Sequence, residues 1–280
     1  MGGVGSGRVA VITGATGGVG AAVARALSKA GYSLVLTAPS MEKLSALASQ
    51  LRGASTVIEG NLGDESLPER LLYAALDRFG RCDVCFNNGA LFEAGIIETV
   101  DIERLSAMVR VNVEGSFRVA YVFLKHFVSE GSGHLVNVSS ALGSGSRPTA
   151  YAATQRAIEV LSDALAAELE DSGILVTSIQ PGLVKTGLHH RWEIAPEGAS
   201  GSGYALEPED FARMVLFIVE QSNVRHSAKE EAIEVIGVAE QPEPENLSCA
   251  DEPAGEDPEG KPEEAGTDEA SAEGFIQDEI

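Results

Sequence analysis

The stretch RVAVITGATGGVG, residues 8–20, decides the fold of this chain. It begins with a short apolar run, turns through glycines, and leads into a segment whose apolar residues recur at helical spacing. Gly14, Gly18 and Gly20 allow a tight turn, close approach of the backbone to a pyrophosphate, and close packing of a helix whose N-terminus faces the phosphates. A glycine pattern alone is weak evidence, but this one follows a strand and opens a helix, which is the required context. The stretch therefore predicts a dinucleotide-binding turn.

Strand and helix patterns alternate along the rest of the chain. Short apolar runs predict further strands within residues 32–39, 55–61, 82–90, 134–140, 174–182 and 232–237. Amphipathic segments predict helices within residues 40–53, 66–80, 101–130, 150–172 and 208–221. Ser40 is a plausible cap of the first of these helices, and Gly53 stands at its end. The alternation predicts a single α/β domain, a Rossmann-like doubly wound parallel sheet with helices on both faces.

The two ends of the chain differ from its body in composition. Residues 241–280 hold 14 acids and one lysine, a net of −13, whereas the other 240 residues hold 28 acids and 19 bases, a net of −9. A segment so rich in acids, prolines and glycines cannot bury enough apolar surface to offset its ordering entropy. We expect a flexible N-terminus at 1–7, a dinucleotide-binding domain at 8–238 and a disordered acidic tail at 239–280. An acidic interaction tail is the alternative.

Composition also indicates which binding partners and which cell compartment to expect. The acidic body offers no basic surface for nucleic acid, and no long charge-free apolar run predicts a membrane span. No signal peptide is visible, so we expect a cytoplasmic protein, although the start MGGVGS also matches the loose pattern for myristoylation. Cys82 and Cys85 form a C-x-x-C pair within a predicted strand, where they would point to opposite faces, so a metal or redox site is not expected there.

Five more motifs follow the glycine turn. They are NNGA at residues 87–90, Asn112 in VNVEG, the strand VNVSS at 136–140, YAATQ at 151–155 and PGLVKT at 181–186. Together with TGATGGVG they make the chain resemble a short-chain dehydrogenase/reductase from about residue 8 to residue 237. That resemblance implies an NAD(P)-dependent oxidoreductase that interconverts a carbonyl and a secondary alcohol by hydride transfer.

The resemblance assigns catalytic roles to four residues. Ser140 would polarise the reacting oxygen and Tyr151 would move the proton. Asn112 would organise a proton-relay water, and Gln155 would anchor the nicotinamide ribose. The chemistry agrees, because hydride transfer to a carbonyl develops negative charge on an oxygen that two hydroxyl groups can stabilise. Structural alternatives stay open: Ser140 could satisfy a turn, Tyr151 could be a packed helix residue, and Asn112 could be a hydrogen-bonding core residue.

The resemblance also assigns the contacts of the cofactor. They are Gly14, Thr16, Gly18, Val19, Gly20, Ser40, Asn61, Leu62, Asn88, Gly89, Pro181, Gly182, Val184 and Thr186. Relatives that prefer NAD usually have aspartate at the position of Ala38, and relatives that prefer NADP often have arginine at the position of Pro39. Both are missing here, so the cofactor is NADP or NAD. We favour NADP slightly, because nothing obvious repels a 2′-phosphate and Ser40 could donate to it.

Several positions depart from the family pattern. Gln155 stands where relatives usually have a lysine that holds the ribose and lowers the pKa of the tyrosine; its amide can reach the ribose but carries no charge. Gly89 and Ala90 are swapped relative to Asn-Asn-Ala-Gly, and only 11 positions separate Ser140 from Tyr151. The alternative to an enzyme is therefore a non-catalytic dinucleotide-binding or scaffold protein.

The resemblance implies a small-molecule carbonyl or alcohol substrate. The region after PGLVKT corresponds to the substrate lid, with Leu188, His189, His190 and Trp192 as candidate contacts. A third ligand for the His-His pair is not in sight, so we expect no metal. Relatives commonly pair through the helices at 101–130 and 150–172, which implies a homodimer or homotetramer.

Overall fold

The fold is built on a parallel sheet of six strands. The computed structural model describes residues 7–95, 97–140, 149–182, 184–186 and 206–221. The chain divides into two units, Met1–Gln241 and Pro242–Ile280, and all described residues belong to the first. The strands are β1 (Val9–Thr13), β2 (Ser33–Ala38), β3 (Ser55–Glu59), β4 (Val84–Asn87), β5 (Gly133–Val138) and β6 (Ile174–Ile179). They are arranged β3-β2-β1-β4-β5-β6, and the order reverses between β1 and β4, where such sheets bind ligands.

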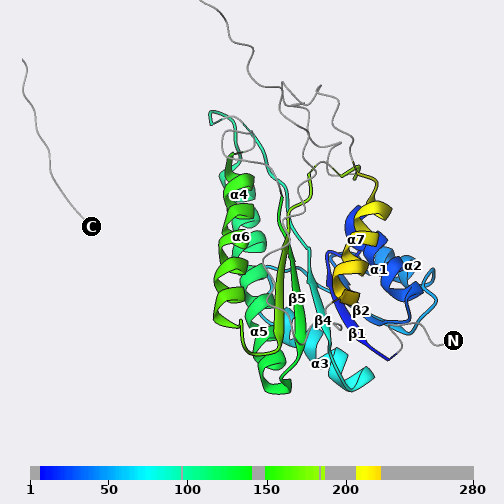
Figure 1. Ribbon diagram of the computed structural model, residues 1–280. Helices are drawn as coiled ribbons and strands as arrows, with labels where there is room; N and C mark the ends of the chain where they lie inside the picture. The colour runs from blue at the N-terminus through cyan, green and yellow to red at the C-terminus, as the bar shows by residue number, and fades with distance from the viewer. Residues whose placement is uncertain (1–6, 96, 141–148, 183, 187–205, 222–280) are drawn as a thin grey trace, which may run out of the picture. The chain divides into compact units, whose positions relative to one another are not determined.

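Helices cover both faces of the sheet. They are α1 (Gly18–Lys29), α2 (Met41–Ala48), α3 (Leu67–Phe79), α4 (Ile102–Val109), the π-helical segment η1 (Arg110–Gly115), α5 (Ser116–Glu130), α6 (Thr149–Glu168) and α7 (Pro208–Gln221). In Figure 1, α1, α2 and α7 lie on one side of the strands and α4, α5 and α6 on the other. One buried apolar cluster joins the sheet to α1, α2 and α7, and a second joins it to α3, α5 and α6. The predicted Rossmann-like architecture is therefore confirmed.

Two helices differ from the sequence expectation. The helix expected over 40–53 ends at Ala48, so Gly53 does not terminate it. Gly53 instead packs closely against the backbone, because a Cβ there would lie 2.9 Å from the carbonyl oxygen of Tyr32. The helix expected over 101–130 is continuous, but its middle, η1, has the wider π-helical turn, a form that is rare and frequent at functional sites. The last predicted strand, 232–237, lies outside the described residues.

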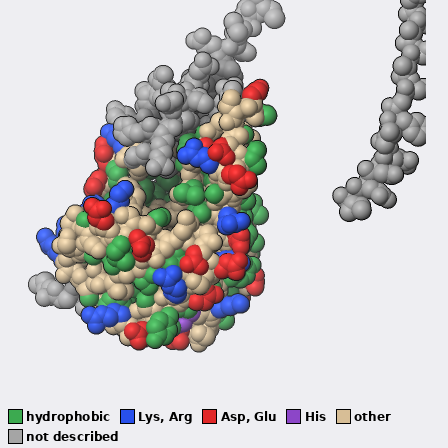
Figure 2. All heavy atoms as spheres, turned by 180° about the vertical axis from the view of Figure 1, so that it is seen from behind, with side chains coloured by type: hydrophobic (Ala, Val, Ile, Leu, Met, Phe, Trp, Pro, Cys, Tyr) green, Lys and Arg blue, Asp and Glu red, His purple; other side chains and the backbone are tan. Residues whose placement is uncertain are grey.

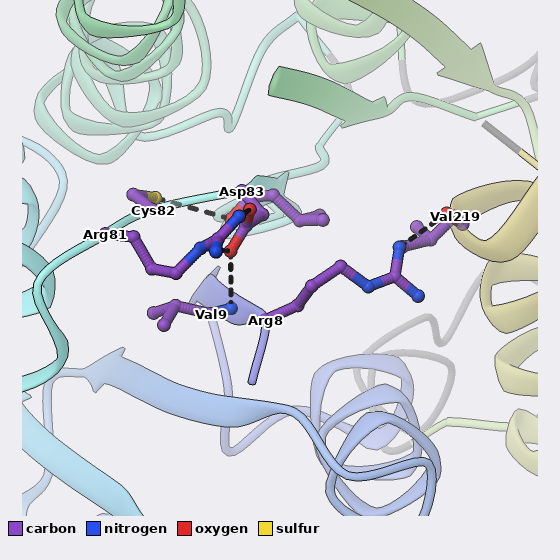
Figure 3. Close-up of polar contacts among 7 residues, drawn as sticks. Arg8, Val9, Arg81, Cys82, Asp83 and Val219 are labelled. Atoms are coloured by element: carbon purple, nitrogen blue, oxygen red, sulfur yellow. Dashed lines mark hydrogen bonds and ion pairs between the residues drawn. The ribbon is translucent and has the colours of Figure 1, made fainter. Parts of the chain in front are cut away.

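Charged side chains hold the N-terminal edge of the sheet. Asp83 Oδ2 accepts the backbone N–H of Val9 at 2.8 Å, and Arg81 Nε donates to both oxygens of Asp83, at 3.1 and 2.9 Å (Figure 3). From the start of β1, Arg8 Nη1 reaches α7 and donates to the carbonyl of Val219 at 3.4 Å (Figure 3). These contacts lie at the edge opposite the strand C-termini, so they do not occupy the C-terminal edge.

The C-x-x-C pair is buried in the apolar core. The expectation of opposite faces was wrong, because Cys82 precedes β4 and both thiols lie in the cluster shared with α3 and α5. Burial raises the pKa of the Cys82 thiol and of the Cys85 thiol well above the usual range, so both stay protonated. Within the part of the chain that the structure describes, no group of three or more His, Cys, Asp or Glu is placed to hold a metal ion.

The surface mixes charges of both signs. On the face shown in Figure 2, acidic and basic side chains are interspersed. Large apolar side chains are exposed on α4, α5 and α6, namely Ile102, Val109, Tyr121, Val128 and Val160. No helix among the described residues has both the length and the apolar character needed to cross a bilayer.

Candidate active site at the C-terminal edge of the sheet

The glycine-rich turn joins β1 to α1 at the C-terminal edge of the sheet. Gly14 has φ of 62°, in the left-handed region, and a Cβ there would lie 2.7 Å from the Cα of Gly89. Only glycine combines that dihedral angle with so close a backbone approach. Gly17, the N-cap of α1, has no side chain that could cap the first N–H groups of the helix, where the dipole favours an anion. The turn therefore offers the backbone that a pyrophosphate needs.

Thr13, the last residue of β1, ties this turn to the end of β4. Its buried hydroxyl accepts hydrogen bonds from the backbone N–H groups of Asn88 and Gly89, both at 2.9 Å. Asn88 Nδ2 in turn donates to the carbonyl of Thr13 at 3.2 Å. These bonds bring two predicted cofactor contacts, Asn88 and Gly89, against the glycine turn. Thr13 was not among the predicted site residues, although it is the first residue of the TGATGGVG motif.

The swapped order of Gly89 and Ala90 has a steric reason. A Cβ on Gly89 would lie 2.6 Å from Cδ1 of Leu62, which is buried just after β3. Gly115, at the end of η1, packs against the backbone of the same Leu62. Leu62 therefore fills the space that an alanine side chain at position 89 would need. The methyl group stands instead on Ala90, which is exposed.

Asn112 lies in η1 and is 1% exposed. Its Oδ1 accepts the N–H of Leu91 at 2.8 Å, and its Nδ2 donates to the carbonyl of Leu91 at 2.9 Å. Nδ2 also donates to Thr154 Oγ1 at 3.0 Å, and Thr154 donates to the carbonyl of Tyr151 at 2.7 Å. The polar atoms of the Asn112 side chain are thus engaged in hydrogen bonds with protein groups. These bonds fix the loop after β4 against the first two turns of α6. Thr154 is a second residue that the sequence analysis did not single out.

Tyr151 lies in the first turn of α6 and is 6% exposed. The Phe92 ring meets it edge-on, with 5.0 Å between the ring centroids. Burial raises the pKa of Tyr151 to about 12, because the phenolate would lose its hydration. One helical turn further on, Gln155 is buried and carries no charge that would favour the phenolate.

The end of β5 is tied to the middle of α6. Ser139 Oγ donates to Glu159 Oε1 at 3.3 Å, and the buried Glu159 also forms an ion pair with Arg156. Ser140, the predicted catalytic serine, follows directly and is half-buried. Arg156 is therefore engaged with Glu159, and the sequence analysis did not identify this anchor.

The segment after β6 faces the glycine turn. A Cβ on Gly18 would lie 2.8 Å from Cγ2 of Thr186, so these two predicted cofactor contacts are neighbours. Val184 forms a bridge with Leu206, and the N–H of Lys185 donates to the Leu206 carbonyl at 2.9 Å, which fixes this segment. The other predicted contacts of the turn and of this segment are half-buried: Thr16, Val19, Pro181 and Gly182.

Two predicted contacts at the far end of the site serve local turns. Ser40 caps α2 as expected, with Oγ accepting the N–H of Lys43 at 3.3 Å. Asn61 Oδ1 accepts the N–H of Gly63 at 2.9 Å. The Ser40 hydroxyl hydrogen and the Asn61 amide hydrogens are donors that these bonds do not use.

The described residues bring the glycine turn, Leu62, Asn88–Gly89, Thr186, Asn112 and Tyr151 to one edge of the sheet, from segments far apart in the sequence. Residues 141–148, which follow Ser140, lie outside the described residues. So do residues 187–205, with the candidate substrate contacts Leu188, His189, His190 and Trp192.

Known proteins match this chain over most of its length. A family model described as short chain dehydrogenase matches residues 8–196. An uncharacterised oxidoreductase of Staphylococcus epidermidis is 32% identical over 219 residues, which are 76% of this chain and 91% of the relative. The crystal structure of a metagenomic short-chain oxidoreductase in complex with NADP is 27% identical, with a TM-score of 0.67 over 82% of this chain and 96% of that one. The crystal structure of 3-ketoacyl-(acyl-carrier-protein) reductase from Brucella melitensis complexed with NADH is 26% identical in sequence. It has a TM-score of 0.74 and covers 83% of this chain and 98% of the reductase.

Proposed function

Because this chain belongs to the short-chain dehydrogenase family, we propose that it is an NAD(P)-dependent oxidoreductase that interconverts a carbonyl and a secondary alcohol. The loop after β4 carries this proposal, because it contacts both halves of the site. Thr13 holds Asn88 and Gly89 against the glycine turn, and Asn112 holds Leu91 against the helix of Tyr151. A cofactor at the turn would then lie beside the tyrosine.

NAD or NADP would supply the hydride acceptor or donor, and the residues present fit such a cofactor. The relatives with solved structures include one that holds NADP and one that holds NADH. Uncapped N–H groups at the start of α1 would bind the pyrophosphate, since Gly14 allows close approach there. Gln155 would hold the nicotinamide ribose through its amide, in place of the lysine of relatives, and Thr186 would contact the nicotinamide amide.

The two hydroxyl groups would handle the proton. Ser140 would donate a hydrogen bond to the reacting oxygen, and Tyr151 would give it a proton during reduction or take one during oxidation. Reduction needs the neutral phenol, which is the populated form of a tyrosine at neutral pH, and burial favours it further by raising the pKa of Tyr151 to about 12. Oxidation needs the phenolate, which the same burial disfavours.

A second candidate function is a non-catalytic dinucleotide-binding or scaffold protein. One observation favours it: Tyr151 and Gln155 are both buried, and the charged neighbour Arg156 is paired with Glu159. Backbone groups could still bind a dinucleotide at such a site. Without a cation near the tyrosine, however, the phenolate would be less stabilised, and proton transfer would be slower.

The test is to measure cofactor binding and turnover side by side. NADH and NADPH binding is measured by fluorescence, and their consumption is followed with a panel of ketones. Tyr151→Phe is expected to keep binding and to lower turnover by about 100-fold or more, the usual share of a general acid. Tyr73→Phe, which removes an exposed hydroxyl from α3, is the matched control and should leave both unchanged. Binding without turnover on any ketone favours the scaffold, and failure to bind either dinucleotide contradicts both functions.

We also propose that the protein is a homodimer or homotetramer, with a domain boundary near residue 238. The exposed apolar side chains on α4, α5 and α6 support a contact between copies through these helices. The composition of residues 239–280 supports a tail that the catalytic domain does not need. Sedimentation velocity on the full chain measures the first proposal directly.

A further inference from the structure

The end of β3 places a carboxylate beside the expected site of the adenosine ribose. In dinucleotide-binding sheets the end of the second strand faces this ribose, where an acid binds the 2′-hydroxyl and a cation accommodates a 2′-phosphate. Ala38, at the end of β2, can do neither. The register of the sheet, however, pairs Ala38 with Glu59, the last residue of β3. An acid is therefore present at this end of the site, on the neighbouring strand.

The side chain of Glu59 is held at the start of α2. Its Oε1 accepts the backbone N–H of Met41, the first residue of that helix, at 2.9 Å. Ser40 Oγ accepts the N–H of Lys43 at 3.3 Å. Two backbone donors at the helix N-terminus are thus satisfied by protein oxygens, and one of those oxygens is charged. A phosphate, which such a terminus would otherwise attract, would have to compete with Glu59.

The Glu59 carboxylate has no ion-pair partner among the described residues, since no Lys, Arg or His there forms an ion pair with it. Arg70 lies close, but its Nη2 donates to the backbone carbonyl of Glu59 at 3.4 Å and its Nη1 pairs with Asp64. The Glu59 carboxylate therefore carries a negative charge without an ion-pair partner among the described residues, and it would repel a second anion.

We propose that Glu59 excludes the 2′-phosphate and makes this site prefer NAD to NADP. The inference rests on the proposed function, and it opposes the slight preference for NADP expected from the sequence. That expectation depended on the missing acid at Ala38, and the pairing of β3 with β2 supplies one from elsewhere. An unphosphorylated ribose offers hydroxyl donors to the carboxylate, whereas a 2′-phosphate brings two like charges against it.

Glu59→Gln isolates the charge, because the amide oxygen can still accept the Met41 N–H. Dissociation constants of NAD+ and NADP+ are measured on the full-length chain by titration calorimetry. Wild type is expected to bind NAD+ about tenfold more tightly, the effect of one carboxylate on a dianion a few ångströms away in a solvated site. The variant should lose this difference through tighter NADP+ binding, with NAD+ changed less than about twofold. Added salt should reduce the discrimination of wild type more than that of the variant.

Glu42→Gln is the matched control, since Glu42 is an exposed acid in the first turn of the same helix. It should leave the ratio of the two dissociation constants close to that of wild type. Equal affinities in wild type, a wild-type preference for NADP+, or an equal gain from Glu42→Gln would each overturn the role of Glu59 and leave the proposed function standing. A wild type that binds neither dinucleotide would overturn the proposed function itself and this inference with it.

Discussion

Tyr151 and Gln155 are four positions apart on α6, so they share one face of the helix. Burial raises the pKa of Tyr151 to about 12, and a buried amide gives the phenolate only a dipole in return. Arg156 lies about 100° further around the helix and is paired with Glu159, so it does not take the place of a cation beside the tyrosine. On the proposed function, the strength of Tyr151 as an acid or base would therefore depend on position 155.

Gln155→Lys is expected to raise turnover, on the proposal that Gln155 stands in for a lysine. The ammonium would favour the phenolate, and a decrease of about 2 units in the tyrosine pKa is worth up to about 100-fold in rate. The pH profile of alcohol oxidation should move to lower pH, since the base would ionise more easily. Steady-state NAD(P)H oxidation and NAD(P)+ reduction on one substrate panel measure both effects.

Gln155→Met is the control for this substitution, because it keeps the length of the side chain without charge or amide. It should not exceed wild type, and Tyr151→Phe should remove the gain in the lysine background. A wild type that is already faster than its lysine variant would show that Gln155 is suited to its task and that the site is not a weakened one.

Some residues of the site could be predicted from the sequence and others could not. Gly14 was predictable because a turn with φ of 62° between strand and helix requires glycine. The bonds that make Thr13 and Thr154 part of the site come from Asn88 and Asn112, which lie 75 and 42 positions away, so the sequence does not reveal these pairings. Glu59 depends on the register between β2 and β3, which the sequence leaves open.

At the scale of elements, η1 connects the loops near the glycine turn with the helix that carries Tyr151. Its wider turn carries Asn112 into contact with Leu91 and with Thr154 of α6, and its last residue, Gly115, lets the backbone pack against Leu62. The apolar pattern predicted a continuous helix here and was right about its extent. The π-helical turn coincides with these tertiary contacts, which the apolar pattern of one helix does not contain.

Asn112→Ala should destabilise the protein by roughly 2 kcal/mol, because the two partly buried hydrogen bonds to Leu91 and the buried one to Thr154 are lost. Dinucleotide affinity should fall as well, since the loop from Asn88 to Leu91 would be free to move. Urea unfolding and calorimetric binding measure the two effects. Arg110→Ala, an exposed position in the same segment, is the control and should change stability by less than about 0.5 kcal/mol. Equal stability of the two variants would contradict a fixing role for Asn112.

At the scale of the whole molecule, the two edges of the sheet have different tasks. The C-terminal edge holds the candidate site, with its glycines and the backbone N–H groups at the start of α1. At the N-terminal edge, Arg8, Arg81 and Asp83 form hydrogen bonds instead (Figure 3). The alternation of strands and helices sufficed to predict this layout, since parallel strands with crossover helices admit few arrangements. The bonds from Val9 to Asp83 and from Arg8 to Val219 were not predictable, because they join segments that lie 74 and 211 positions apart in the sequence.

His134 lies near that closed edge, at the start of β5, and is buried. Its backbone N–H donates to the carbonyl of Asp83 at 2.9 Å, and its Nε2 lies 2.8 Å from Thr177 Oγ1 on β6. Nδ1 has no hydrogen-bond partner among the described residues. Burial lowers the pKa of His134 from 6.5 to about 4 in the folded protein, because an imidazolium there would lose its hydration.

This depressed pKa predicts a pH dependence of stability with a definite sign. Above pH 6.5 His134 is neutral in both states; as the pH falls from 6.5 toward 4, the unfolded chain binds a proton that the folded protein rejects, so stability is lost. The free energy of unfolding falls by about 3 kcal/mol over this window, relative to a protein without the imidazole.

Urea unfolding of wild type and His134→Gln between pH 7 and pH 4 isolates the contribution of His134, since carboxylates titrate alike in both proteins. The advantage of wild type over the variant should shrink as the pH falls. Thr177→Val is the control: it removes the hydroxyl partner but keeps the imidazole, so it should lower stability and retain the wild-type slope. Parallel curves for wild type and His134→Gln would mean that His134 is protonated as readily in the folded protein as in the unfolded chain.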